Sequence, residues 1–136
     1  MHIITTLERG GAENQLSILI EQQVQHGHQV TCIPLKGSPE LDEEIRNTGA
    51  RVIDDVRNRC FLSQLLILKK HLKNSNVIVH AHLPRAEIAG FFCVGRNEFV
   101  ISRHNSESFF PKANRYISST LSKIVTRRSK TVICIS

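Results

Sequence analysis

The chain has 136 residues, of which 40% are hydrophobic and 22% are charged, a balance typical of one soluble globular domain and not of a disordered chain. No apolar run approaches the roughly 20 residues of a membrane-spanning helix, and the start lacks the charged and apolar blocks of a secretory signal, so we expect a cytoplasmic protein. The net charge of +6 predicts anionic surroundings, either lipid or a phosphorylated substrate, whereas the scarcity of aromatic residues near the basic ones argues against nucleic acid.

Short runs rich in Val and Ile alternate with helical patterns along the whole chain. The runs predict six strands, at about residues 2–6, 29–35, 51–54, 77–82, 99–103 and 131–135. Strands that alternate with helices build a parallel sheet with right-handed crossovers and helices on both faces. We therefore expect an α/β fold, a three-layer Rossmann-like domain with a mostly parallel sheet, over residues 1–136.

The first two helices have clear apolar faces and start or stop signals. One runs from about Ala12 to His26 and stops at Gly27. The next opens with Ser38 as N-cap, followed by a proline and acidic residues, and contacts the core through Leu41 and Ile45. The apolar residues of the first helix are Leu16, Leu19, Ile20 and Val24.

Three more helices are expected in the second half of the chain. The third covers about residues 61–72, the fourth begins at Pro84, and the fifth shows a helical apolar period from Ala113 to Val125. The leucines expected against the sheet in the first of them are Leu62, Leu65, Leu66 and Leu72. Basic residues gather on two of these helices, either as a solvated face or for attraction to a membrane surface: Lys69, Lys70 and Lys73, then Arg127, Arg128 and Lys130.

The four cysteines are scattered along the chain and do not form a C-x-x-C motif. Such spacing does not predict a disulfide framework or a cysteine metal site. We interpret Cys32, Cys60, Cys93 and Cys134 as buried free thiols.

Two consecutive glycines, Gly10 and Gly11, separate the first strand from the first helix. Glycine lets backbone N–H groups approach a ligand closely, and a helix start favours negative charge. A tight turn between a strand and a helix can also require glycine for conformation alone. Both interpretations stay open at this point.

Polar residues also follow the fourth strand. His80 and His82 lie two residues apart, so their side chains face the same side of the strand. A metal would need further ligands, for which His104 is the obvious candidate and Glu107 a weaker one; hydrogen bonding to a neighbouring loop is the simpler interpretation. Arg85 lies at the start of the next helix, where it could meet an acidic group.

His104 and Asn105 follow the fifth strand, where the sheet gives way to a polar loop. An imidazole there can donate to a sugar hydroxyl or relay a proton near neutral pH, or it can simply cap its own loop. Asp54 and Asp55 follow the third strand, and such acidic residues either bind a ribose, accept a phosphoryl group or are simply solvated. In doubly wound sheets ligands bind outside the carboxyl ends of the strands, so these segments and the loop near Lys36 and Gly37 should converge on one edge.

Two other families with this fold fail on their motifs. A dinucleotide-binding domain would have G-x-G-x-x-G in the first turn, where this chain has Arg9-Gly10-Gly11-Ala12. A receiver domain would have acidic residues after the first strand and a lysine after the fifth, and this chain has Thr5-Thr6 and Arg103 there.

Four segments together resemble the N-terminal domain of family 4 glycosyltransferases, in the same order and with the same spacing over essentially all 136 residues. The segments are Gly10-Gly11-Ala12-Glu13, the run from His26 to Thr31, the block from Val79 to Ala86, and Ile101-Ser102-Arg103-His104-Asn105.

The resemblance implies an enzyme of two Rossmann-like domains (the GT-B fold) that transfers a sugar, hexosyltransferase-type, from a nucleotide-sugar donor to a glycan or lipid-linked acceptor, with retention and with no metal or cofactor. This chain would be the acceptor-side half, truncated before a C-terminal donor-binding domain and inactive alone. It would be cytoplasmic, either free or at the inner face of the membrane with peripheral membrane contact. The resemblance places His104 in catalysis, and the substrate-binding residues as Arg9, Gly10, Gly11, His80, His82, Arg85 and Asn105.

Two other classes of function compete with this one. The first is a non-catalytic glycan- or nucleotide-binding module with the same fold. The second is a metal-dependent hydrolase built on His80, His82 and His104.

Overall fold

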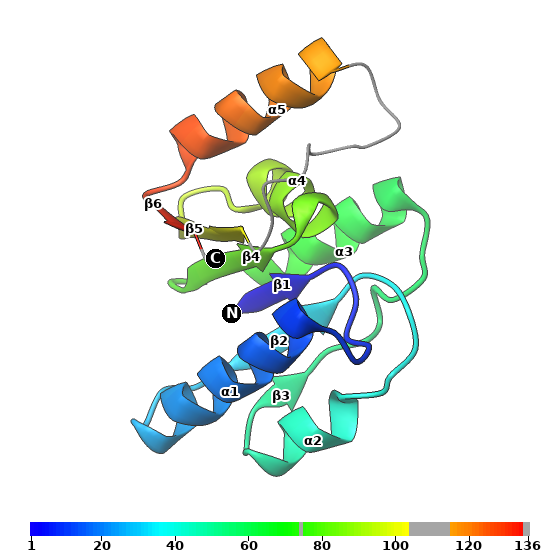
Figure 1. Ribbon diagram of the computed structural model, residues 1–136, viewed down its shortest axis with the longest axis vertical. Coiled ribbons are helices and arrows are strands. Elements are labelled where there is room, and N and C mark those ends of the chain that lie inside the picture. Colours follow the sequence, from blue (N-terminus) through cyan, green and yellow to red (C-terminus); the bar gives the residue numbers. More distant parts are fainter. Residues whose placement is uncertain (74, 104–114, 135–136) are drawn as a thin grey trace.

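A computed structural model describes residues 1–73, 75–103 and 115–134, with side chains from residue 118 onward in the last range. Within these residues the chain forms a six-stranded sheet in the order β3-β2-β1-β4-β5-β6 (Figure 1). The strands are β1 (His2–Ile4), β2 (Thr31–Pro34), β3 (Arg51–Val52), β4 (Ile78–His82), β5 (Glu98–Arg103) and β6 (Thr131–Cys134).

Helices alternate with these strands along the chain. They are α1 (Gly11–Gln25), α2 (Asp42–Asn47), α3 (Phe61–Leu72), α4 (Pro84–Cys93) and α5 (Arg115–Arg128). None of the helices in the described part of the chain is long and apolar enough to cross a bilayer.

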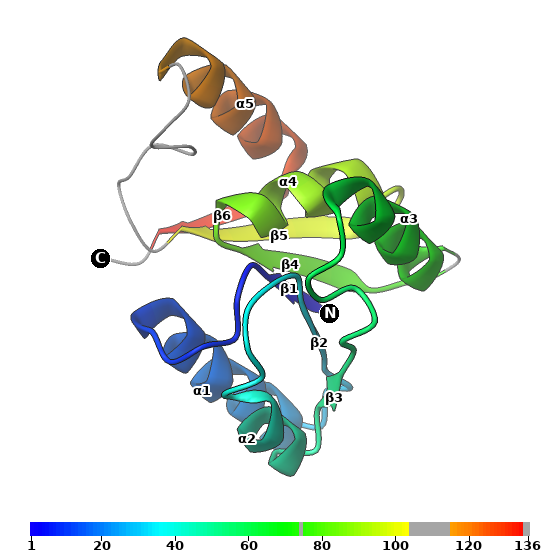
Figure 2. The ribbon, with the colours of Figure 1, turned by 90° about the vertical axis from the view of Figure 1, so that its right-hand side faces the viewer.

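Every pair of neighbouring strands is parallel. α1 and α2 lie on one face of the sheet, and α3, α4 and α5 lie on the other, as Figure 2 shows. The crossover from β3 to β4 therefore changes faces, which is how right-handed connections build a doubly wound sheet. The predicted α/β, three-layer Rossmann-like fold with a parallel sheet is confirmed.

The alternation of side chains along each strand divides the core between the two faces. Ile4 packs with Leu16, Ile20 and Ile45 under α1 and α2. On the other face the core includes Ile3, Leu68, Phe99, Ile101 and Val125, from β1, α3, β5 and α5.

The prediction that Ser38 caps the second helix is wrong. α2 begins at Asp42, after Leu41, and Pro39 lies outside it. The Ser38 hydroxyl donates instead to Glu8 and to Glu40, each at 3.2 Å. Ser38 is thus held by the loop that follows β1, and the turn that it occupies stays outside the helix.

The expected orientation of α3 is wrong for two of its four leucines. Leu62 and Leu66 are 73% and 70% exposed, whereas Leu68 is buried. The cause lies in Gln64, whose side-chain amide donates to the carbonyl groups of Leu35 at 2.6 Å and Val56 at 3.2 Å. This buried amide turns its own side of the helix toward the sheet and leaves the stripe of Leu62 and Leu66 outside.

The cysteines divide into two pairs. Cys32 and Cys93 are buried, as predicted, and burial raises the pKa of the Cys32 thiol to about 12. Cys60 and Cys134 are exposed, so the prediction is wrong for both. Cys134 lies in β6, an edge strand with one unpaired side, and Cys60 precedes the first turn of α3.

Gly90 gives a test of packing between α4 and the sheet. A Cβ atom at this position would lie 2.7 Å from Cε2 of Phe99, a fully buried ring in β5. We expect Gly90→Ala to lower the free energy of unfolding, because overpacking costs about 1–3 kcal/mol and exceeds the roughly 1 kcal/mol that alanine gains in a helix. Urea denaturation measures the difference.

Gly11→Ala is the matched control, because a Cβ at Gly11 would have no atom within 4 Å. Its unfolding free energy should stay within about 0.5 kcal/mol of the original protein. A Gly90→Ala protein as stable as this control would show that Phe99 can move aside without cost.

Candidate functional site at the carboxyl ends of the strands

Three loops meet at the edge of the sheet where β1, β2 and β3 end, and we call this edge the rim. In a parallel sheet all strands end on the same side, so the loops that follow them are brought together by topology alone. Backbone hydrogen bonds fix these loops to one another: Leu41 N–H donates to Leu7 C=O at 3.2 Å, and Asn58 N–H donates to Leu35 C=O at 2.9 Å.

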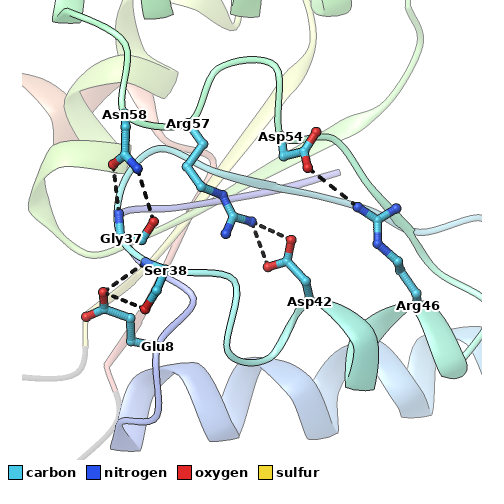
Figure 3. Close-up of polar contacts among 8 residues, drawn as sticks. All are labelled: Glu8, Gly37, Ser38, Asp42, Arg46, Asp54, Arg57 and Asn58. Atoms are coloured by element: carbon cyan, nitrogen blue, oxygen red, sulfur yellow. Dashed lines mark hydrogen bonds and ion pairs between the residues drawn. The ribbon is translucent and has the colours of Figure 1, made fainter.

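Gly37 is the point where the side chains of the three loops converge (Figure 3). Its N–H donates to the Asn58 side chain at 3.0 Å, and the Asn58 amide donates back to Gly37 C=O at 3.2 Å. Glu8, from the loop after β1, accepts from the N–H of Ser38 at 3.0 Å. Gly37 has a φ of +83°, and a Cβ there would lie 2.7 Å from the Glu8 carboxylate, so only glycine fits this turn.

A buried ion pair supports these loops from below. Nη2 of Arg57 donates to both carboxylate oxygens of Asp42, at 2.6 and 2.5 Å, and each side chain is 10% exposed. The other nitrogens of this guanidinium, Nε and Nη1, are buried and have no hydrogen-bond partner among the described residues. Figure 3 shows the guanidinium between Ser38 and Asp42. Unpaired buried donors of this kind are costly, so they mark a place where a ligand or water can be bound.

These loops line a shallow surface cavity of about 700 Å³ that is largely open to solvent. Its wall mixes carboxylates, an amide, a hydroxyl and a guanidinium, which suits a ligand rich in hydroxyl groups. The lining residues are Glu8, Gly37, Ser38, Pro39, Asp54, Arg57 and Asn58. The sequence pointed to Asp54 and to the loop near Gly37, and it did not identify Glu8, Arg57 or Asn58 as site residues; their one signal was their place after the ends of the first and third strands.

The two glycines of the first loop differ from each other. A Cβ at Gly10 would lie 2.5 Å from Oε2 of Glu13, a side chain that accepts from Thr6 Oγ1 at 2.7 Å. At Gly11 a Cβ would meet no atom within 4 Å, and its φ lies outside the left-handed region. Packing in this domain therefore accounts for Gly10, but neither packing nor backbone conformation accounts for Gly11.

The two arginines predicted to bind substrate occupy different environments. Arg9 is exposed, and its N–H donates to Glu40 at 3.1 Å. Arg85, in the first turn of α4, donates to Gln64 at 2.9 Å and lies over the ring of Phe61, 4.9 Å from its centroid. Arg9 is thus available at the rim, whereas Arg85 lies on the α3 side and is linked through Gln64 to the loops after β2 and β3.

His80 and His82 face the same side of β4, as predicted, but they are only 7% and 2% exposed. The parallel register places His2 of β1 beside His80. Nδ1 of His2 lies 3.0 Å from Nε2 of His82, and Nε2 of His2 lies 2.8 Å from the side-chain oxygen of Gln23 in α1. His80 Nε2 is hydrogen-bonded to the hydroxyl of Ser102 at 2.7 Å.

The protons of this cluster can be assigned from its partners. An amide oxygen only accepts, so His2 carries its hydrogen on Nε2 and donates to Gln23; its Nδ1 then accepts from His82. Burial lowers the pKa of His2 to about 3, so this ring is neutral near pH 7.

A metal ion is a further candidate for this cluster, because one ligand atom from each of His2, His80 and His82 lies within 4.8 Å of the others. The third histidine is therefore His2, which sequence reasoning did not consider. Hydrogen bonds to Gln23 and Ser102 already use Nε2 of His2 and of His80. The arrangement is explained by hydrogen bonding between β1, β4, β5 and α1.

His104 and Asn105, predicted to act in catalysis and substrate binding, lie outside the described residues. Arg103, directly before them, ends β5 and donates to the buried carboxylate of Glu87 in α4 at 3.0 Å.

The pH dependence of stability tests the His2 cluster. Because the pKa of His2 is lower in the folded protein than the ordinary 6.5, the unfolded chain binds the proton more readily. The stabilisation that this difference provides is complete above pH 6.5 and is lost as the pH falls toward 3, by about 1.4 kcal/mol per unit of pKa difference. Urea denaturation of the original protein and of His2→Asn between pH 7 and pH 4 measures this contribution, with His80, His82 and the amino terminus unchanged. Equal losses in the two proteins would contradict it.

Comparison with known proteins places the chain in a family. The family model described as Glycosyltransferase Family 4 matches residues 9–136. A search of curated proteins gives no significant match. The match covers α1 to β6, including Gly10, Gly11 and the loops after β2 and β3. The chain therefore belongs to glycosyltransferase family 4.

Proposed function

We propose that this domain is the N-terminal, acceptor-side half of an enzyme that transfers a hexosyl group from a nucleotide-sugar donor to a glycan or lipid-linked acceptor. A second Rossmann-like domain would hold the donor nucleotide across a cleft from the rim. Family membership supports sugar transfer in general, and the resemblance to two-domain enzymes of this family supports the division of labour. A cytoplasmic location at the inner face of the membrane is part of the same proposal.

The observation that carries the proposal is the empty space at Gly11. Gly11 begins α1, and the first N–H groups of a helix have no partner within it. Nothing in the described domain occupies the place of a Cβ there. A ligand that needs close approach to these N–H groups, such as a sugar phosphate, explains the glycine where packing does not.

The cavity beside this loop suits the acceptor. Sugar hydroxyl groups both donate and accept, and the wall offers carboxylates that accept and a guanidinium that donates. The guanidinium of Arg57 is held in place by the pair with Asp42, and two of its buried nitrogens have no hydrogen-bond partner among the described residues. Preorganised donors of this kind are what stabilise developing charge in a transition state.

Roles for the predicted residues follow from their environments. Arg9, Gly10 and Gly11 contact substrate at the rim, where Arg9 is exposed. Arg85, half-buried against Phe61, contacts the acceptor or positions Gln64 beneath it. His80 and His82 are buried, so their role is to hold the neighbouring strands and loops of the site in position. His104 and Asn105 contact the transferred sugar.

Chemistry in such a site needs stabilisation of the departing phosphate and exclusion of water from an oxocarbenium-like transition state. The helix start at Gly11 would meet the phosphate, and closure of the second domain would exclude water. His104 would donate a hydrogen bond to the transferred sugar. No metal is part of this proposal.

Substitution of Gly11 tests directly whether a ligand binds at the start of α1. In the complete enzyme, Gly11→Leu should lower the rate of sugar transfer at least about tenfold, because the side chain fills the space for the ligand, while the free energy of unfolding should change by less than about 0.5 kcal/mol. Asn14→Leu is the matched control, since Asn14 is exposed one turn further along α1. If Gly11→Leu transfers sugar at the rate of this control, the start of α1 is not a ligand-binding site.

The role of His104 is tested separately. His104→Ala should lose most of the turnover, on the order of a hundredfold for a lost proton or hydrogen-bond donor, and should keep the fold by circular dichroism. Initial rates with a panel of nucleotide sugars measure the effect. Turnover equal to that of the original enzyme would exclude His104 from catalysis.

A binding module without catalysis is distinguished by the same assay. Calorimetric binding of a glycan or nucleotide by the complete protein, without transfer from any donor in the panel, would favour the module. Transfer with retained anomeric configuration would favour the enzyme. We expect the domain alone to be inactive in this assay.

A further inference from the structure

Charge is distributed unequally between the two faces of the sheet. α1 and α2, on one face, carry Glu13, Glu21, Asp42, Glu43 and Glu44 and a single basic residue, Arg46. α3 and α5, on the other face, carry no acidic residue within their bounds. The positive net charge of the chain is therefore concentrated on the layer formed by α3, α4 and α5 (Figure 2).

The outer side of α3 combines positive charge with apolar side chains. Leu62 and Leu66 lie one turn apart and are 73% and 70% exposed. Lys69 and Lys70 continue this side of the helix at spacings of three and four residues from Leu66. Lys73 directly follows the last residue of the helix, and all three lysines are exposed. We call these five residues the α3 stripe.

The lysines of the α3 stripe form no ion pair with any residue in the described ranges. Asp55 lies near the same helix, and its carboxylate is 3.0 Å from Nε2 of His71. Positive charge on the stripe is thus not neutralised within this part of the chain.

A further exposed apolar side chain lies on α4, the helix that packs against α3. Phe92 of α4 is 52% exposed. Its neighbour Cys93 contacts α3, with Sγ 3.4 Å from Leu65 C=O, and Lys69 lies near enough to act on the pKa of that thiol. Apolar side chains from two adjacent helices beside unpaired lysines are what an interfacial surface requires.

We propose that the α3 stripe, with Phe92, docks this domain on an anionic membrane surface. Leu62, Leu66 and Phe92 would enter the boundary between headgroups and acyl chains, while the lysines reach lipid phosphates on flexible stems. A folded acidic protein would be expected to offer carboxylates in fixed positions, which suits arginine better than three lysines. The role of this docking, access to a lipid-linked acceptor, rests on the proposed function. Membrane binding itself does not depend on that function, because it needs no substrate.

Vesicle sedimentation of the complete protein tests the docking. Vesicles of phosphatidylcholine with about 30% phosphatidylglycerol should bind the protein at low salt. Binding should weaken at high salt, because screening shortens the range of the lysine charges. Lys69→Gln, Lys70→Gln and Lys73→Gln together should lower the partition coefficient on the order of a hundredfold. Leu62→Ser with Leu66→Ser should lower it at every salt concentration, because these substitutions remove the apolar contribution.

Matched controls lie outside the α3 stripe, on α1 and on the edge strand β3. Ile18 of α1 is 61% exposed and Arg51 is also exposed, so Ile18→Ser with Arg51→Gln removes an apolar and a basic side chain without touching the stripe and should leave the partition coefficient unchanged. Circular dichroism confirms that each variant is folded.

Each outcome decides one question. No binding to anionic vesicles, or equal loss in the control and stripe variants, overturns the docking surface. Capture by an acidic protein without vesicle binding overturns it too. Sugar transfer to a soluble acceptor is measured beside it: vesicle binding without transfer rejects the proposed function alone, and transfer without vesicle binding rejects the docking surface alone.

Discussion

Parallel pairing of all six strands is the constraint on which the rest of this domain depends. It sends every strand end to one edge and obliges every connection to cross a face of the sheet as a helix or long loop. The rim is a direct product of this geometry. Gly37 then joins the loops, since the left-handed turn at this residue lets Glu8 and Asn58 approach from either side. Three short loops become one polar wall with little freedom to move.

The pair of Arg57 with Asp42 adds an electrostatic element to that wall. A buried ion pair seldom adds much net stability, since desolvation offsets most of the attraction. Here one nitrogen, Nη2, contacts both carboxylate oxygens. Nε and Nη1 stay buried in a region of low dielectric constant, without a hydrogen-bond partner among the described residues. The pair therefore keeps a positive group fixed under the cavity. Its contribution lies in geometry, which a looser lysine in the same place could not give.

The fold could be predicted because its signal is repeated along the chain. Val- and Ile-rich runs that alternate with helical patterns leave few assemblies other than a parallel sheet. Phe99 and Ile101, two residues apart in β5, pack on the same face, as the period of a strand predicts. Local signals failed where a distant group decided the outcome. Ser38 looks like a helix cap until Glu8 binds it, and Leu62 looks like a core residue until the buried amide of Gln64 turns α3.

The same limit applies to the site. Gly10, Gly11 and the paired histidines could be found from their positions next to strand ends. His2 could not, because only the register of β1 against β4 places it beside His80. Arg57 and Asn58 sit in a loop whose sequence has no recognisable motif, and their importance comes from Asp42 and Gly37. Contacts between residues far apart in the chain are the part of a site that single-sequence patterns do not contain.

The direction of α3 fixes how the rim would face a surface beneath it. α3 packs against the sheet with its axis roughly along the strands (Figure 1), so a flat surface touching its outer side also runs along the strands. The rim, where the strands end, then opens sideways, parallel to that surface. A lipid-linked acceptor would therefore approach the cavity from the side, along the surface.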